Sequence, residues 1–111
     1  MKVLSLFDGI SCGMLALQRA GIPVECYDAF EIDKYAVTVS KRNFPVIVHH
    51  GNVYDGDFTQ FKGYDLLLGG SPCTYWSIAK KDREIDCNGE GFKLFKEYVR
   101  ALEESGCQYF L

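Results

Sequence analysis

Short apolar runs alternate with stretches of helical spacing in the first part of the chain. Residues 3–7 form a short apolar run, typical of a buried parallel strand, and apolar residues follow at helical spacing over 14–20. Gly21, with a proline two positions further on, ends this predicted helix. A second strand is predicted over 24–30, after which Asp33 is placed to cap a second helix.

The same alternation continues to the end of the chain. The β-branched residues 46–48 predict a third strand, and a polar, turn-rich loop follows over 51–57. Residues 64–68 predict a fourth strand, and apolar residues at helical spacing over 92–102 mark an amphipathic helix before a last strand begins at 108–111. This order of elements predicts an α/β fold with a doubly wound, mostly parallel sheet.

One segment interrupts the alternation. Residues 79–91 are charged, contain glycine and have almost no apolar side chains. A loop of this length is usually functional or disordered, so we interpret the segment as a lid on the surface.

Composition narrows the class of protein. The chain is 48% hydrophobic and 24% charged, which fits a single folded globular domain. A net charge of −3 gives no overall attraction for a polyanion, so any DNA binding would depend on local clusters or on further parts. Five cysteines without a Cys-x-x-Cys pair, and no apolar run long enough for a signal peptide or membrane span, indicate an intracellular protein without a metal or membrane partner.

The loops after the predicted strands hold the candidate site, because ligands of open parallel sheets bind where the strands end. In the first loop, Gly9 and Gly13 let the backbone approach a ligand near helix N–H groups, although such turns are often only tight connections. Glu31 ends the second strand, where a carboxylate can accept both hydroxyls of a ribose; its alternative role, at a helix start, is already met by Asp33. Asn52, in the third loop, could accept from an adenine amino group or simply stabilise a turn.

The fourth loop, residues 69–73, carries the most specific pattern. It has the sequence Gly-Gly-Ser-Pro-Cys and directly follows an apolar strand. Cys73 therefore lies in a stiff turn that faces a ligand, and we interpret it as a nucleophile. The other four cysteines fit the usual role of a free cysteine, a small buried hydrophobe.

Taken together, these residues resemble the cytosine-5 DNA methyltransferase family, especially the branch with Phe-Asp-Gly-Ile in its first motif. The similarity covers essentially the whole chain. The matching segments, in family order and spacing, are Leu4-Ser5-Leu6-Phe7-Asp8-Gly9-Ile10 with Gly13, then Glu31, then Gly51-Asn52-Val53, then residues 65–73 with Ser77, and finally Leu94-Phe95.

The resemblance implies a Rossmann-like methyltransferase fold with S-adenosyl-L-methionine as the cofactor. The cofactor-binding residues that it implies are Phe7, Asp8, Gly9, Gly13, Glu31, Ile32, Asn52, Val53, Pro72 and Leu94. Cys73 would attack C6 of a flipped-out cytosine, making C5 nucleophilic enough to take the methyl group; the C5 proton then leaves and the thiolate is expelled. Ser71, Pro72 and Ser77 would contact the substrate.

The sequence also departs from the family pattern. Thr74 stands where the family most often has glutamine or asparagine, and Asn52 replaces the usual aspartate, which keeps an acceptor but removes a charge. In the family, the strand that matches 108–111 leads into a Glu-Asn-Val motif, followed by an arginine motif, a target-recognition domain and a last cofactor motif. We therefore expect residues 1–111 to be a partial catalytic domain, from a fragment or a split subunit, with the target-recognition domain and C-terminal motifs absent.

The expected partners are DNA in the complete enzyme and either a complementing chain or a second copy.

Two other readings stay open on the sequence. An inactive module that binds S-adenosylmethionine, or assembles through its sheet edge, would have the same cofactor loops. A small-molecule methyltransferase would share the cofactor sheet, but the loop at 69–73 argues against it because that class needs no cysteine there.

Overall fold

The computed structural model describes residues 1–75, 81 and 89–111. The strands are β1 Lys2–Leu6, β2 Cys26–Phe30, β3 Val48–His49, β4 Leu66–Gly69 and β5 Tyr109–Phe110. The α-helices are α1 Cys12–Arg19, α2 Lys34–Asn43 and α3 Glu90–Ser105, and the 3-10 helices are η1 Val53–Asp55, η2 Phe58–Phe61 and η3 Cys73–Tyr75.

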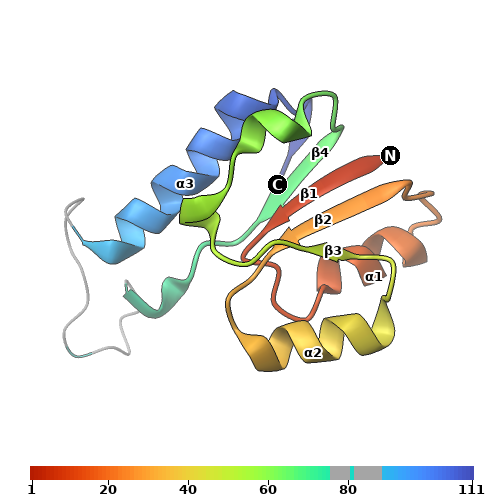
Figure 1. The fold of residues 1–111 in the computed structure, drawn as a ribbon, viewed down its shortest axis with the longest axis horizontal. Coiled ribbons are helices and arrows are strands. Elements are labelled where there is room, and N and C mark those ends of the chain that lie inside the picture. Colours follow the sequence, from red (N-terminus) through yellow and green to blue (C-terminus); the bar gives the residue numbers. More distant parts are fainter. Residues whose placement is uncertain (76–80, 82–88) are drawn as a thin grey trace.

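The five strands form one parallel sheet in the order β3-β2-β1-β4-β5. Helices α1 and α2 cover one face, and α3 covers the other face together with the segment that carries η1 and η2 (Figure 1). The chain therefore winds outward from β1 in one direction to β3 and then returns to the other side of β1 as β4. This confirms the predicted doubly wound α/β fold and places the topological switch point between β1 and β4.

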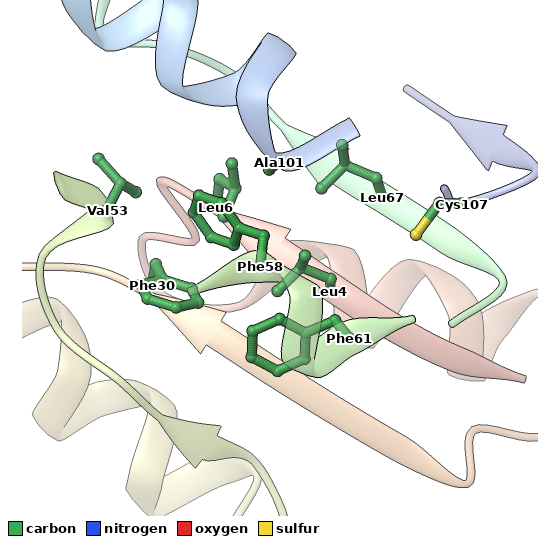
Figure 2. Packing of buried hydrophobic residues seen from close by; sticks show 9 residues of the cluster. All are labelled: Leu4, Leu6, Phe30, Val53, Phe58, Phe61, Leu67, Ala101 and Cys107. Atoms are coloured by element: carbon green, nitrogen blue, oxygen red, sulfur yellow. The ribbon is translucent and has the colours of Figure 1, made fainter. Parts of the chain in front are cut away.

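The alternation of side chains along β1 gives the sheet two cores. Leu4 and Leu6 face α3, and Val3 faces α1 and α2, so β1 is buried from both sides. The cluster beneath α3 comprises Leu4, Leu6, Phe30, Val53, Phe58, Phe61, Leu67, Ala101 and Cys107 (Figure 2). The opposite cluster comprises Val3, Met14, Leu17, Tyr27, Ala29 and Ile47. Burial on both faces explains the short apolar runs of the sequence.

Helix ends follow the predicted signals. The Asp33 carboxylate accepts from the backbone of Tyr35 and Ala36 at the start of α2, and Gly106 ends α3 in the left-handed conformation with φ 66°. Residues 90 and 91 already belong to α3, so the prediction of a lid that reaches residue 91 is wrong at that end. The rest of that prediction lies outside the described residues, apart from Lys81, which is in a turn.

The third strand is shorter than its β-branched run predicts. Val48 and His49 pair with Asp28 and Ala29, whereas Val46 precedes the strand and is 72% exposed. Within the described parts of the chain, no helix combines the length and hydropathy that a membrane crossing requires.

Candidate functional site

The loop after β1 contains three residues in the left-handed region of backbone conformation. Phe7, Gly9 and Ser11 have φ angles of 55°, 61° and 70°. Phe7 and Ser11 carry side chains, which make this conformation costly, so it persists only where the surrounding structure holds it. The loop is therefore fixed by its neighbours rather than by local preference.

The Asp8 carboxylate holds this loop. Ser5 and Tyr27 donate their hydroxyls to Oδ1, each at 2.6 Å, and Ser11 donates to Oδ2. Burial and the hydrogen bond to Asp8 raise the pKa of Tyr27, so its phenol stays protonated and remains a donor. Ser40 extends the network, with its Oγ 2.5 Å from that of Ser11. The hydroxyls of Ser5, Ser11 and Tyr27 thus bind the Asp8 carboxylate, to which the family resemblance assigns a role in cofactor binding.

Glu31 is positioned by backbone donors on both sides. Its Oε1 accepts from Gly9 N at 2.8 Å, and its Oε2 accepts from Ile32 N at 2.9 Å and Asp33 N at 3.0 Å. A carboxylate has about four acceptor positions, so these bonds leave room for one further donor. A ligand hydroxyl can therefore bind one open acceptor position of Glu31, and a second hydroxyl would have to share an oxygen with a backbone N–H.

Asn52 stabilises a turn, which is one of the two roles that the sequence left open for it. Its side-chain oxygen accepts from Tyr54 N at 3.0 Å and caps η1. The residue also lines a cavity, so the turn role does not remove it from the candidate site.

Loops at the carboxyl ends of β1, β2, β3 and β4 meet around a cavity of about 220 Å³. Its lining includes the sequence-predicted residues Phe7, Glu31, Ile32, Asn52, Val53, Pro72 and Leu94. Gly51, which belongs to the matching segment Gly51-Asn52-Val53, also lines it, but the sequence did not single out its other lining residues, which are Phe30, Tyr54, Tyr75 and Glu90. Tyr54 directly follows Asn52-Val53, so its place in the chain could have indicated it. Glu90 carries no such signal because α3 brings it in from 36 residues further along.

A second cavity, of about 260 Å³, adjoins the first at Phe7. The loops after β1 and β4 form it, with Asp8, Gly13, Gly69 and Gly70 in its lining. A Cβ atom on Gly13 would lie 2.8 Å from Leu68 Cδ1 and 2.9 Å from the Tyr27 hydroxyl, so α1 can approach the sheet this closely only with glycine there. Gly9 lines neither cavity and contributes through its bond to Glu31.

Cys73 is exposed and is the first residue of η3. The expectation that the other cysteines are buried holds for Cys107 but is wrong for Cys12, which is exposed; Cys26 is half-buried, and Cys87 lies outside the described residues. Cys73 directly follows Pro72, which lines the first cavity. Ser71 lies in a different hollow beside Phe95 and Tyr98, so the structure separates it from Pro72, and Ser77 lies outside the described residues. The predicted nucleophile is therefore exposed and adjoins in the chain a residue that lines the first cavity.

The lining of the first cavity is apolar and acidic. The first cavity combines apolar side chains with the carboxylates of Glu31 and Glu90, and its described lining includes no lysine or arginine. Phosphate groups would be repelled there, whereas a sulfonium cation would not. The adjoining cavities together reach the size range of small-ligand sites. Among residues 1–75, 81 and 89–111, no group of three or more His, Cys, Asp or Glu is arranged to hold a metal ion.

Comparison with known proteins identifies the family. The model of the C-5 cytosine-specific DNA methylase family matches residues 1–111. The chain belongs to this family. It is 36% identical over 114 residues to the orphan methyltransferase M.SPRI of Bacillus phage SPR, and this match covers 100% of the chain but 25% of the phage protein. It is 32% identical over 116 residues to the DNA (cytosine-5)-methyltransferase DRM2 of Arabidopsis thaliana, covering 93% of the chain and 18% of DRM2.

Solved structures show the same fold. The S. pombe Dnmt2 methyltransferase superposes with a TM-score of 0.66 at 20% identity, covering 93% of this chain and 32% of the Dnmt2 chain. A Spodoptera frugiperda DNMT2 mutant gives 0.61, also at 20% identity, covering 94% of this chain and 41% of the other. The family member described here thus has the Rossmann-like methyltransferase fold that the sequence predicted, and it spans about a quarter of M.SPRI.

Proposed function

We propose that the chain is the cofactor-binding and nucleophile-bearing part of a DNA cytosine-5 methyltransferase and acts with the rest of a longer enzyme. The observation that carries this proposal is the convergence of four strand-end loops on two adjoining cavities, with an exposed Cys73 directly after Pro72, which lines the first of them. The family match over all 111 residues supports the same reaction class. Because the chain spans about a quarter of its phage relative, the complete activity belongs to the longer enzyme.

The cavities fit S-adenosylmethionine, which supplies a methyl group carried on a positively charged sulfur. Ile32, Val53 and Leu94 form apolar walls on which an adenine can pack, and Glu31 accepts from the ribose. The methionine part would extend past Phe7 into the second cavity, towards the loops after β1 and β4. Pro72 lies between the first cavity and Cys73, so the reacting carbon of a cytosine bound at Cys73 would lie near the end of the cofactor.

Cys73 has a defined task in this reaction. Its thiolate forms a bond to C6 of cytosine, and the electron pair of the C5–C6 double bond shifts so that C5 becomes nucleophilic. Once C5 has been methylated and has given its proton to a base, the electron pair returns and the C6–S bond breaks. The protein is thereby released unchanged. The exposed position of Cys73 at the rim allows a base extruded from DNA to reach it.

A covalent trap tests this role. The chain is combined with the remaining portion of a family enzyme, S-adenosylmethionine and a 5-fluorocytosine oligonucleotide. Fluorine cannot leave C5 as a proton does, so the C6–S bond should persist and give an adduct that survives denaturation. Cys73→Ser should give none, and Cys12→Ser, which alters another exposed cysteine, should give as much as the wild-type chain. An adduct that forms equally with Cys73→Ser would contradict the assignment, and cofactor binding without any adduct would indicate the inactive module.

Calorimetry tests the cofactor assignment in the 111-residue chain. Glu31→Ala should weaken S-adenosylmethionine binding roughly tenfold to a hundredfold, because it removes a charged acceptor and the anchor of Gly9 N–H. Glu103→Ala, an exposed change on α3, serves as the matched control and should leave the dissociation constant unchanged. Equal binding by the Glu31 and Glu103 variants would show that the cofactor assignment is wrong.

A further inference from the structure

A hydrogen bond joins two walls of the first cavity. The Tyr54 hydroxyl donates to Glu90 Oε1 at 2.6 Å, and the two residues are 36 positions apart in the sequence. Tyr54 belongs to η1 and Glu90 is the first residue of α3, and both line the cavity together with Glu31. The bond therefore links the loop after β3 to the helix that carries Leu94.

Other, deeper contacts also join η1 and α3. Arg100, two to three turns further along α3, donates to Val53 O at 3.0 Å and to Gly56 O at 2.8 Å, and its guanidinium lies over the Phe58 ring. These contacts fix η1 against the middle of α3. Tyr54 is 41% exposed, so its bond to Glu90 lies at the outer edge of the cavity, where a local opening would not disturb the core.

Tyr54 stays a hydrogen-bond donor over the whole neutral range of pH. Burial and the hydrogen bond to Glu90 raise the pKa of its phenol to about 12. A protonated phenol that donates to a carboxylate is a charge-assisted pair, which is stronger than a bond between two neutral groups. The pair thus joins the two walls at the outer edge with one bond that can break and form again without changing charge.

We propose that Tyr54 and Glu90 form a clasp that controls the entry and exit of the nucleoside ligand, an inference that rests on the proposed function of this cavity. The two are positioning residues: they hold the wall formed by α3 against the wall formed by η1. Because the bond joins two walls of the cavity, opening it widens the cavity for entry as well as for release. Its strength then sets both rates, while the affinity depends on the rest of the cavity.

Stopped-flow binding of S-adenosylmethionine to the 111-residue chain tests the clasp. In Tyr54→Phe and in Glu90→Ala, the association and dissociation rate constants should both rise about threefold to tenfold, the range expected for the loss of one hydrogen bond. The dissociation constant should stay within about twofold of wild type. The double variant should show no further increase, because both changes remove the same bond. Tyr35→Phe removes a hydroxyl from a side chain that is 78% exposed on α2 and should leave both rates unchanged.

Two outcomes would overturn the clasp. Unchanged rates in both single variants would show that the bond does not limit exchange. A faster dissociation with unchanged association would show that the pair is an ordinary ligand contact.

A measurement without ligand separates the clasp from the proposed function. Amide exchange at Lys93, whose N–H donates to Gly89 O in the first turn of α3, should be faster in Tyr54→Phe by a similar factor. Equal exchange in the variant and wild type would overturn the clasp. If the wild-type chain binds no S-adenosylmethionine, the proposed function fails for this chain, and the exchange result alone decides whether Tyr54 and Glu90 restrain α3.

Discussion

At the scale of single residues, Asp8 shows how one carboxylate can hold a whole loop in place. Its two oxygens accept from Ser5, Ser11 and Tyr27, which come from β1, from the loop and from β2. A carboxylate is the suitable acceptor because it takes several donors at once and has no proton of its own to place. The left-handed turn around Phe7 depends on this set of bonds.

Replacing Asp8 should therefore cost stability more than its size suggests. Asp8→Ala leaves three hydroxyls without their acceptor and should lower the free energy of unfolding by about 2 to 4 kcal/mol in urea denaturation. Asp8→Asn keeps one oxygen and should lose roughly half as much. A change below about 0.5 kcal/mol for Asp8→Ala would show that the network contributes little to the fold.

The sequence predicted the members of the site better than their contacts. Glu31 and Asn52 could be singled out because each follows a strand, and the structure brings both to one cavity. Their existing bonds to Gly9 and Tyr54 could not be predicted, because they depend on how separate loops face each other. The assignment of Asp8 to the cofactor remains a prediction: the residue lines the second cavity, but Tyr27 and two serines occupy its carboxylate.

At the scale of elements, α3 depends on a polar contact as well as on its apolar face. Ala101 packs in the core, and Arg100 beside it reaches across to the backbone carbonyls of Val53 and Gly56. Glu97 and Glu104 flank the guanidinium on the helix itself. Arg100 thus donates to the carbonyl of Val53 in η1 and to the carbonyl of Gly56 in the turn after it. Neither carbonyl takes part in strand pairing.

Arg100→Lys tests this contact because it keeps the charge and removes the planar fork of donors. The variant should lose about 1 to 2 kcal/mol of unfolding free energy, since a single ammonium cannot reach both carbonyls in the same geometry. Arg19→Lys, an exposed change in the last turn of α1, is the control and should have almost no effect in the same thermal or urea melts. Equal stability of the two variants would mean that the fork is dispensable.

The elements themselves were largely readable from the sequence. Strands buried on both faces have apolar runs, and the caps at Asp33 and Gly106 mark the ends of helices. The run at 46–48 misplaced the third strand because β-branched residues also occur outside strands, as Val46 does in an exposed turn before β3. The 3-10 turns η1 and η2 have no periodicity of their own, since their residues are held by Asn52, Asp57 and Arg100.

At the scale of the whole molecule, the strand order could be inferred only from the fold class. Nothing in the apolar runs distinguishes β1 as the central strand, and its place becomes visible only when β4 returns to its second edge. At the other side of β4, β5 forms the end of the sheet with Phe110 62% exposed. Unpaired strand edges of this kind can pair with further strands.

The central position of β1 also orders events during synthesis on the ribosome. The strand can pair with β2 as soon as residue 30 has emerged, but its other partner begins at residue 66. At translation rates of about 5 to 20 residues per second, the gap lasts roughly 2 to 7 seconds. During that interval the nascent chain presents a central strand with one unpaired edge, the kind of segment that chaperones shield. When translation reaches Gly69, one half of the sheet can already be in place, and Cys73 is delivered onto a surface that has begun to form.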